Sequence, residues 1–356
     1  MLFTLGLLVS IIYIPGYIGW AIPPQWALLS VLLIPVLWLP ARVPWTGTAF
    51  LASAALSLLW STSWQDGIFV LWQISILALA FRLGAASPSL HRLWLGLFTG
   101  LLISTVIATA QYWGFEPFLT NPESVEPSGL FFNSVVFGAV ACVIASAFME
   151  TSWLMVLCLP ALLLAQSRGA WIAFALTFIV CLTKRFWPSL LLGCLVLAGV
   201  VYGGSLSDAV RIAIWETTLR GLNFLGHGAG SFANIWIQHP WHNGLRWTHP
   251  EVAHNEYLDL VYQFGIGSAF ALLLLAAPLW QRRFSPDWYP LFSIAILSIY
   301  SSPWHYPVVA FAGACCAGRL CDDLARHGAY SFDRGLALQP WGLPPGSESI
   351  PMELGT

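Results

Sequence analysis

His254 is the residue best suited to acid–base chemistry, and it opens the stretch HNEYLDLVYQFGIGS. Histidine changes its charge near neutral pH, so its side chain suits a group that takes or gives a proton. The spacing of apolar residues over 254–268 predicts a helix. The predicted face that begins with His254 continues through Leu258, Val261, Gly265 and Ser268. The opposite predicted face carries Glu256, Asp259 and Gln263.

The start of this helix also has a sequence signature. Thr248 and Glu251 have the spacing of a capping box, with Pro250 in the first turn, so we expect the helix to begin just before His254. An ionisable ring on the apolar face of a helix that enters a membrane is costly and marks a functional candidate. The alternative is a core histidine with one satisfied hydrogen bond.

Arg168 is the second candidate, because it lies in LLLAQSRGAWIAFAL with apolar helical sequence on both sides. A guanidinium at that place can hold a phosphate or carboxylate through two parallel hydrogen bonds. The alternative is that its long side chain reaches back to the membrane surface without a further role.

A further cluster of polar residues lies in the segment 208–222, whose spacing is helical. It places Arg211, Trp215 and Thr218 on one face, and Arg211 can alternatively pair with Asp208 or stack on Trp215. Glu216 and Arg220 form a favourable i, i+4 pair. Arg246, between Leu245 and Trp247, is a weaker candidate cation.

The segment ends at the glycine-rich run GHGAGSF, residues 226–232. Its backbone N–H groups, around Gly228 and Gly230, are able to bind a phosphate. A tight turn that returns the chain to the membrane explains the same glycines.

The composition indicates an all-α, polytopic membrane protein. The chain of 356 residues is 58% hydrophobic and 8% charged, with 20 Trp and 22 Phe. A soluble protein carries about 25% charged residues, roughly three times as many. The net charge of −2 gives no reason to expect a nucleic-acid partner. The seven cysteines lie in or beside apolar runs, which is typical of small buried residues rather than of disulfides or a zinc site.

The apolar runs predict about twelve membrane spans within residues 1–327. Their approximate ranges are 2–21, 25–39, 45–60, 67–83, 93–113, 131–149, 153–166, 169–183, 187–203, 255–280, 288–304 and 306–320. Residues 1–20 lack a basic n-region and a clear cleavage site, which favours a retained first span over a signal peptide. The tail 328–356, rich in Pro and Gly, is expected to be a disordered cytoplasmic segment.

The basic residues predict a cytoplasmic N-terminus and a cytoplasmic C-terminus. In that orientation ten of the 14 Lys and Arg residues lie inside, as the positive-inside rule requires. The large loop 204–253 then lies outside. The basic residues left on the outer side are Arg168, Arg211, Arg220 and Arg246.

Four motifs occur together in a fixed order. They are SRGAW at 167–171, the RxxxW of Arg211 and Trp215, GHGAGSF at 226–232, and the HN-x9-G of 254–265. In this order, in a chain with many spans and a large outer loop, they resemble the O-antigen ligase and polymerase family of bacterial membrane glycosyltransferases. The later run WHYPVVAFAGACCAGRL is similar to the closing spans of that family. The resemblance covers about residues 130–320.

The resemblance implies a GT-C-like, metal-independent transferase of the bacterial inner membrane that uses no cofactor. Its donor is a glycan on undecaprenyl diphosphate, presented at the periplasmic face. An O-antigen ligase with lipid A-core as acceptor is the first expectation. A polysaccharide polymerase and a protein O-oligosaccharyltransferase remain alternatives, because the shape of the outer loops selects the acceptor.

The residues themselves suit such a reaction. A departing diphosphate needs fixed cations, for which Arg168 and Arg211 are the candidates and Arg246 a third. His254 can take the acceptor proton, oriented by Asn255 or Glu256, in a transfer that inverts the anomeric centre.

Two other classes of protein remain as alternatives. A transporter or flippase also has many spans, although it would more often show charged residues in mid-span and paired halves with broken helices. Metal binding by His239 and His242, spaced i, i+3, lacks a carboxylate or cysteine to complete a defined geometry. We therefore expect no metal site.

Overall fold

The computed structural model describes residues 1–11, 22–40, 45–115, 127–131, 133–184, 206–234 and 252–326. Every regular element in these ranges is helical and none is a strand, which confirms the predicted all-α class. The helices are α1 (Leu2–Ile11), α2 (Ile22–Leu33), η1 (Ile34–Trp38), α3 (Trp45–Ser57), η2 (Leu58–Trp60), α4 (Trp64–Ala86), α5 (His91–Tyr112), α6 (Ser134–Ala147), α7 (Ser152–Ala165), α8 (Arg168–Thr183), α10 (Leu206–Arg220), α12 (Glu256–Ala276), η3 (Ala277–Arg282), α13 (Trp288–Tyr300), η4 (Pro303–His305) and α14 (Pro307–Arg326).

The helices follow the predicted apolar runs closely. Every expected range except 187–203, which lies outside the described residues, contains a helix. Polar residues set several of the starts. The side chain of Asn133 accepts a hydrogen bond from the N–H of Val136 and caps α6, and Ser167 does the same for Ala170 at the start of α8. These caps satisfy N–H groups that a helix start leaves without an intrahelical partner.

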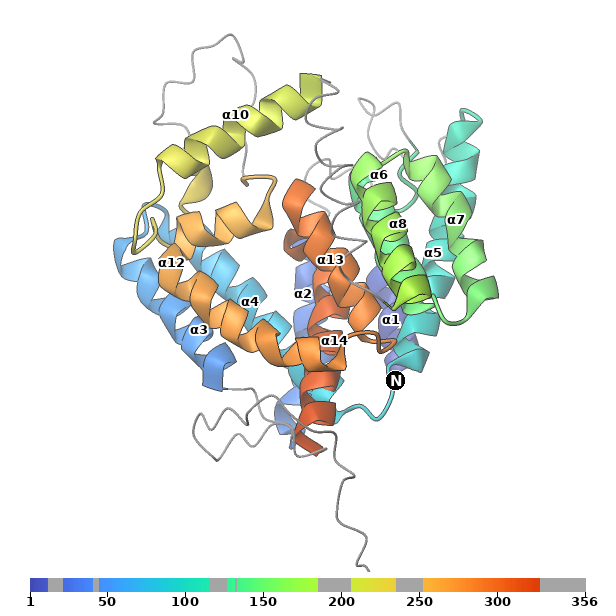
Figure 1. Ribbon diagram of the computed structural model, residues 1–356, viewed down its shortest axis with the longest axis horizontal. Coiled ribbons are helices and arrows are strands. Elements are labelled where there is room, and N and C mark those ends of the chain that lie inside the picture. The colour runs from blue at the N-terminus through green and yellow to red at the C-terminus, as the bar shows by residue number, and fades with distance from the viewer. Residues whose placement is uncertain are drawn as a thin grey trace, which may run out of the picture.

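Helices that are distant in sequence pack directly on one another in the main core (Figure 1). The α4–α14 pair depends on Gly84 and Gly318, where an added Cβ would meet the backbone of Cys315 and Phe81. Small residues allow this close approach of two helix backbones. The helices α6, α7, α8 and α13 pack together as a bundle. The buried side chains of this bundle and of the α4–α14 pair belong to one continuous apolar core.

Two of the described helices, α4 and α5, are long and apolar enough to cross a membrane by length and composition. Other apolar helices have 10–17 residues. Large apolar side chains are exposed on several of the helices, such as Val106 at 70%, Leu182 at 67% and Leu273 at 66%.

The cysteines are buried, as predicted. All six in the described residues are free and buried, and Cys194 lies outside those residues. The predicted tail 328–356 also lies outside the described residues, as do residues 235–250 of the predicted loop 204–253.

The helix α12 and the segment before it form a separate layer with α3 and α10 (Figure 1). A small second core joins Ile214 of α10 to Phe232, Ala253 and Tyr262. The backbone of α12 is broken at Gly265, which has φ 77° and ψ 174°. At this kink Ile266 donates a hydrogen bond to the carbonyl of Phe224. The glycine-rich turn therefore packs against the backbone of α12 at this kink, where an added Cβ at Gly226 would meet Gly265.

Candidate functional site

His254 precedes α12 rather than lying on it. The helix begins at Glu256, with Asn255 as the N-cap whose side chain accepts a hydrogen bond from Leu258 N–H at 3.1 Å. His254 has φ 50°, which lies in the left-handed region. The predicted helix start before His254 is therefore wrong, because Asn255 has an extended backbone and caps a helix that begins only at Glu256. The proposed capping residues 248–251 lie outside the described residues.

The predicted polar face of α12 is its most buried one. Asp259 and Gln263 are 3% and 4% exposed, and the Gln263 amide donates to the Asp259 carboxylate at 2.6 Å. Gln263 Oε1 in turn accepts the N–H of Gly230 at 2.7 Å. The expectation that His254 lies on an apolar helix face is also wrong. The polar residues turn inward because the glycine-rich turn supplies hydrogen-bond donors for them.

Ala253 holds the backbone that leads into His254. Its carbonyl accepts a hydrogen bond from the Trp215 indole at 3.1 Å, and its N–H donates to Asp259 at 3.3 Å. Ala253 is fully buried. A left-handed backbone costs a non-glycine residue about 1–3 kcal/mol and persists only where its surroundings fix it. Trp215 and Asp259 provide that constraint, together with the cap at Asn255.

The glycine-rich turn uses its N–H groups within the protein. Gly228 N–H donates to the carbonyl of Gln263 at 2.8 Å, and Ala229 N–H donates to Ser57 Oγ at 3.1 Å. Gly230 N–H donates to the Gln263 side chain. Gly228 and Gly230 have φ 93° and 71°, and an added Cβ at either would meet the backbone near α4. The structure thus favours the alternative of a tight turn over a phosphate-binding turn.

Arg211 of α10 lies close enough to His254 to act on its charge from a different element. Burial lowers the pKa of His254, and the neighbouring Arg211 and then His305 add to the decrease. Arg211 also lies within electrostatic range of the Tyr306 hydroxyl. The structure therefore brings together α10, the start of α12 and the start of α14 around a histidine that stays neutral to lower pH than usual.

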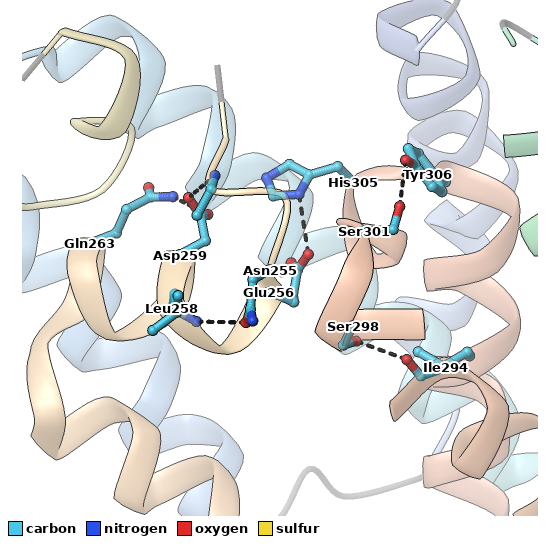
Figure 2. Close-up of polar contacts among 11 residues, drawn as sticks. Asn255, Glu256, Leu258, Asp259, Gln263, Ile294, Ser298, Ser301, His305 and Tyr306 are labelled. Carbon is cyan, nitrogen blue, oxygen red and sulfur yellow. Dashed lines mark hydrogen bonds and ion pairs between the residues drawn. The ribbon is translucent and has the colours of Figure 1, made fainter. Parts of the chain in front are cut away.

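Glu256 contacts a second histidine. Its Oε2 lies 3.5 Å from Nδ1 of His305, which reaches across from η4 to the first turn of α12 (Figure 2). The predicted orienting neighbours of His254 are thus engaged elsewhere, Asn255 as a cap and Glu256 with His305. His305 is not among the residues expected from the sequence. Its place between Pro303 and Pro307, in a polar turn between two apolar runs, is the signal that points to it.

Arg168 lies at the same end of the molecule. It is the first residue of α8 and is exposed, and a Cβ added at Gly169 would lie 3.7 Å from Cβ of Tyr300. Tyr300 ends α13 and leads directly into η4 and His305. Arg246 lies outside the described residues.

The remaining arginine of α10 pairs as predicted. Arg220 forms an ion pair with Glu216, with both side chains largely exposed at 74% and 53%. The pair is therefore a solvated feature of the surface of α10 and suits Arg220 as a control residue.

Among the described residues, no group of three or more His, Cys, Asp and Glu side chains is arranged to hold a metal ion. His239 and His242, on which the metal alternative depends, lie outside them. The chemistry that the described residues offer is cationic and acid–base.

A scan against models of known protein families found no match for this chain, and no curated protein matches it. The resemblance to the O-antigen ligase and polymerase family therefore stays a prediction from the four sequence motifs.

Proposed function

We propose that this protein is a membrane glycosyltransferase that moves a glycan from an undecaprenyl-diphosphate donor to an acceptor hydroxyl. The observation that carries the proposal is the contact between two motifs: Trp215, one turn from Arg211 on α10, donates to the carbonyl of Ala253, the residue before His254, at 3.1 Å. Arg211 also contributes to the lowered pKa of the half-buried His254. A neutral histidine can remove a proton from one reactant, the acceptor. A fixed cation can stabilise the negative charge on the leaving group of the other reactant, the donor.

The arginines would bind the donor. A diphosphate that departs gains negative charge, and a guanidinium stabilises it through two parallel hydrogen bonds. Arg168, the first residue of α8, and Arg211 of α10 are the proposed donor-binding residues, and Arg246 is proposed as a third. Trp215, Gly228 and Gly230 would support the site through the backbone contacts described above.

His254 would take the proton of the acceptor hydroxyl as that oxygen attacks the anomeric carbon. The bond from this carbon to the diphosphate oxygen breaks on the opposite face, so the product has inverted configuration. The acceptor is proposed as lipid A-core, which makes the enzyme an O-antigen ligase. A growing glycan chain or a protein hydroxyl are the alternative acceptors.

The proposed setting is the bacterial inner membrane, with about twelve spans in a GT-C-like arrangement. The exposed apolar side chains of the helices and the bias of basic residues support it. Both termini would be cytoplasmic and the His254 site periplasmic.

The orientation has a direct test in cells. After replacement of the native cysteines, a cysteine placed at Trp241 is expected to react with an impermeant maleimide added from outside, and one at Gln281 is not. The positive-inside rule is the physical reason, because Arg282 and Arg283 follow Gln281. Labelling in the opposite pattern would place the site in the cytoplasm and overturn the proposal.

The reaction itself is tested with purified protein, lipid-linked donor and lipid A-core acceptor. Transfer is expected to continue in excess EDTA, because arginines rather than a metal would neutralise the diphosphate. The product is followed by the mobility shift of the acceptor. Activity that disappears with EDTA and returns with one divalent cation would contradict the mechanism and favour the histidines of 239–254.

A further inference from the structure

A continuous series of hydrogen bonds joins the glycine-rich turn to the residue that precedes His254. Gly230 N–H donates to Gln263 Oε1 at 2.7 Å. The amide nitrogen of Gln263 donates to Asp259 Oδ2 at 2.6 Å (Figure 2). The other carboxylate oxygen, Asp259 Oδ1, accepts the N–H of Ala253 at 3.3 Å. The series therefore begins in the turn and ends one residue before the proposed base.

The carboxylate of Asp259 sets the direction of every hydrogen bond in this series. An ionised carboxylate offers only acceptor atoms, whereas an amide side chain offers one acceptor and one donor group. Because both oxygens of Asp259 receive donors, Gln263 turns its NH2 group toward Asp259 and its oxygen toward Gly230. An amide in place of Asp259 would set two donors against each other at one of these contacts, whichever way the two amides turn.

Trp215 binds the other backbone group of Ala253. The Ala253 carbonyl accepts the indole N–H of Trp215 at 3.1 Å. The residue before His254 is thus held through its N–H from α12 and through its carbonyl from α10. His254 itself has φ 50°, a left-handed backbone that persists only where its surroundings fix it. These two contacts therefore determine where the imidazole of His254 lies.

Burial makes the match of donors and acceptors necessary. Asp259, Gln263 and Ala253 are 3%, 4% and 0% exposed. A buried polar group that loses its partner keeps the full cost of its lost hydration, so a mismatch favours a shift of the nearby backbone. A displacement of about 1 Å at a reacting group can slow a reaction by about 10²-fold. A mismatch at Asp259 would thus act on catalysis by way of His254.

We propose that Asp259 is a positioning residue, which fixes the place of His254 through Ala253 and ties that place to the glycine-rich turn through Gln263. The assignment rests on the proposed function, since it takes His254 as the base. Asp259 contacts neither substrate in this arrangement. It therefore acts on kcat and not on the binding of the donor or the acceptor.

The test reverses the hydrogen-bond polarity at Asp259 and then restores it. Asp259→Asn is expected to lower kcat by about 10²-fold and to leave the donor Kd and the acceptor KM within about twofold. In the double variant Asp259→Asn, Gln263→Glu, the amide donates to the new carboxylate, whose second oxygen accepts Gly230 N–H. Every donor again has an acceptor, so kcat is expected to return to within about fivefold of wild type.

The kinetics are measured with purified protein, lipid-linked donor and lipid A-core acceptor, and kcat is expressed per mole of monodisperse protein in detergent. A purely structural contact would lower the yield or the Tm and leave this kcat unchanged. The matched control is Ser268→Ala, which removes a buried hydrogen bond to the Gly265 carbonyl on the same helix. This control is expected to keep kcat within about twofold of wild type.

Trp215→Phe provides a second variant if Asp259→Asn folds poorly. It keeps an aromatic ring but removes the N–H that donates to the Ala253 carbonyl. Its kcat is expected to fall at least tenfold with an unchanged donor Kd, because one of the two contacts on Ala253 is lost.

The outcomes separate this assignment from the proposed function. A near wild-type kcat in Asp259→Asn would overturn the positioning role alone, as long as wild-type protein transfers glycan and His254→Ala does not. A double variant no better than the single variant would overturn it as well, because hydrogen-bond polarity would then not matter. Wild-type protein that transfers no glycan to any acceptor would overturn the proposed function and the assignment with it.

Discussion

His254→Ala is expected to lower glycan transfer by about 10²–10⁴-fold and to leave donor binding nearly unchanged. The alanine removes the group that takes the acceptor proton, whereas the diphosphate would be held by arginines on other elements. Transfer is measured with purified protein, and donor binding is measured separately with the lipid-linked glycan. A folded His254→Ala protein that transfers glycan at near the wild-type rate would remove His254 from the role of base.

The pH dependence gives the same prediction a second readout. A base must be neutral to accept a proton, and burial together with Arg211 and His305 lowers the pKa of His254. The acidic limb of kcat/KM is therefore expected below about pH 6.5, the ordinary value for histidine. Removing Arg211 takes away one cause of the decrease, so the limb of the residual activity in Arg211→Ala is expected to move to higher pH.

Truncation of either donor arginine is the second change with a large expected effect. Arg168→Ala and Arg211→Ala are each expected to weaken donor binding and to cost about 3–4 kcal/mol of transition-state stabilisation. The reason is that the departing diphosphate loses two parallel hydrogen bonds as well as a charge. Arg168→Lys and Arg211→Lys are expected to fall between wild type and alanine, because an ammonium keeps the charge but not the planar fork.

Arg220→Ala is the matched control on α10. Its ion pair with Glu216 is largely exposed, so its loss is expected to cost about 0–1 kcal/mol of stability and little activity. Each variant is first checked for expression in the membrane and for a single species in detergent. An Arg220 variant as impaired as the Arg211 variant would show that general positive charge on α10, and not a diphosphate contact, determines the activity.

The sequence by itself determined the helical class, the positions of the helices and the burial of the cysteines. A run of apolar residues has no side chains that can hydrogen-bond its backbone N–H and C=O groups, so a helix, which pairs these groups internally, is favoured. A polar residue such as Asn133 caps the N–H groups at the start of such a helix. The i, i+4 pair of Glu216 and Arg220 could be predicted for the same reason, since both residues lie on one turn of one helix.

Only part of the candidate site could be predicted from the sequence. His254, Arg168 and Arg211 could be selected because a charged side chain beside apolar sequence is costly and therefore conspicuous. The backbone around His254 could not be foreseen. Helical spacing extends naturally through the histidine, but Asn255 caps the helix after it, and Gly265 breaks the helix where the glycine-rich turn enters.

Tertiary structure decided which polar groups meet. Asp259 and Gln263 look solvated in a helical projection, yet they are buried because Ala253 and Gly230 donate to them across the fold. His305 joins Glu256 although 49 positions separate them in the chain, and neither residue carries a local signal of the other. Such contacts depend on how α10, α12 and α14 pack, and packing is a property of the assembled helices that the spacing within any one of them does not encode.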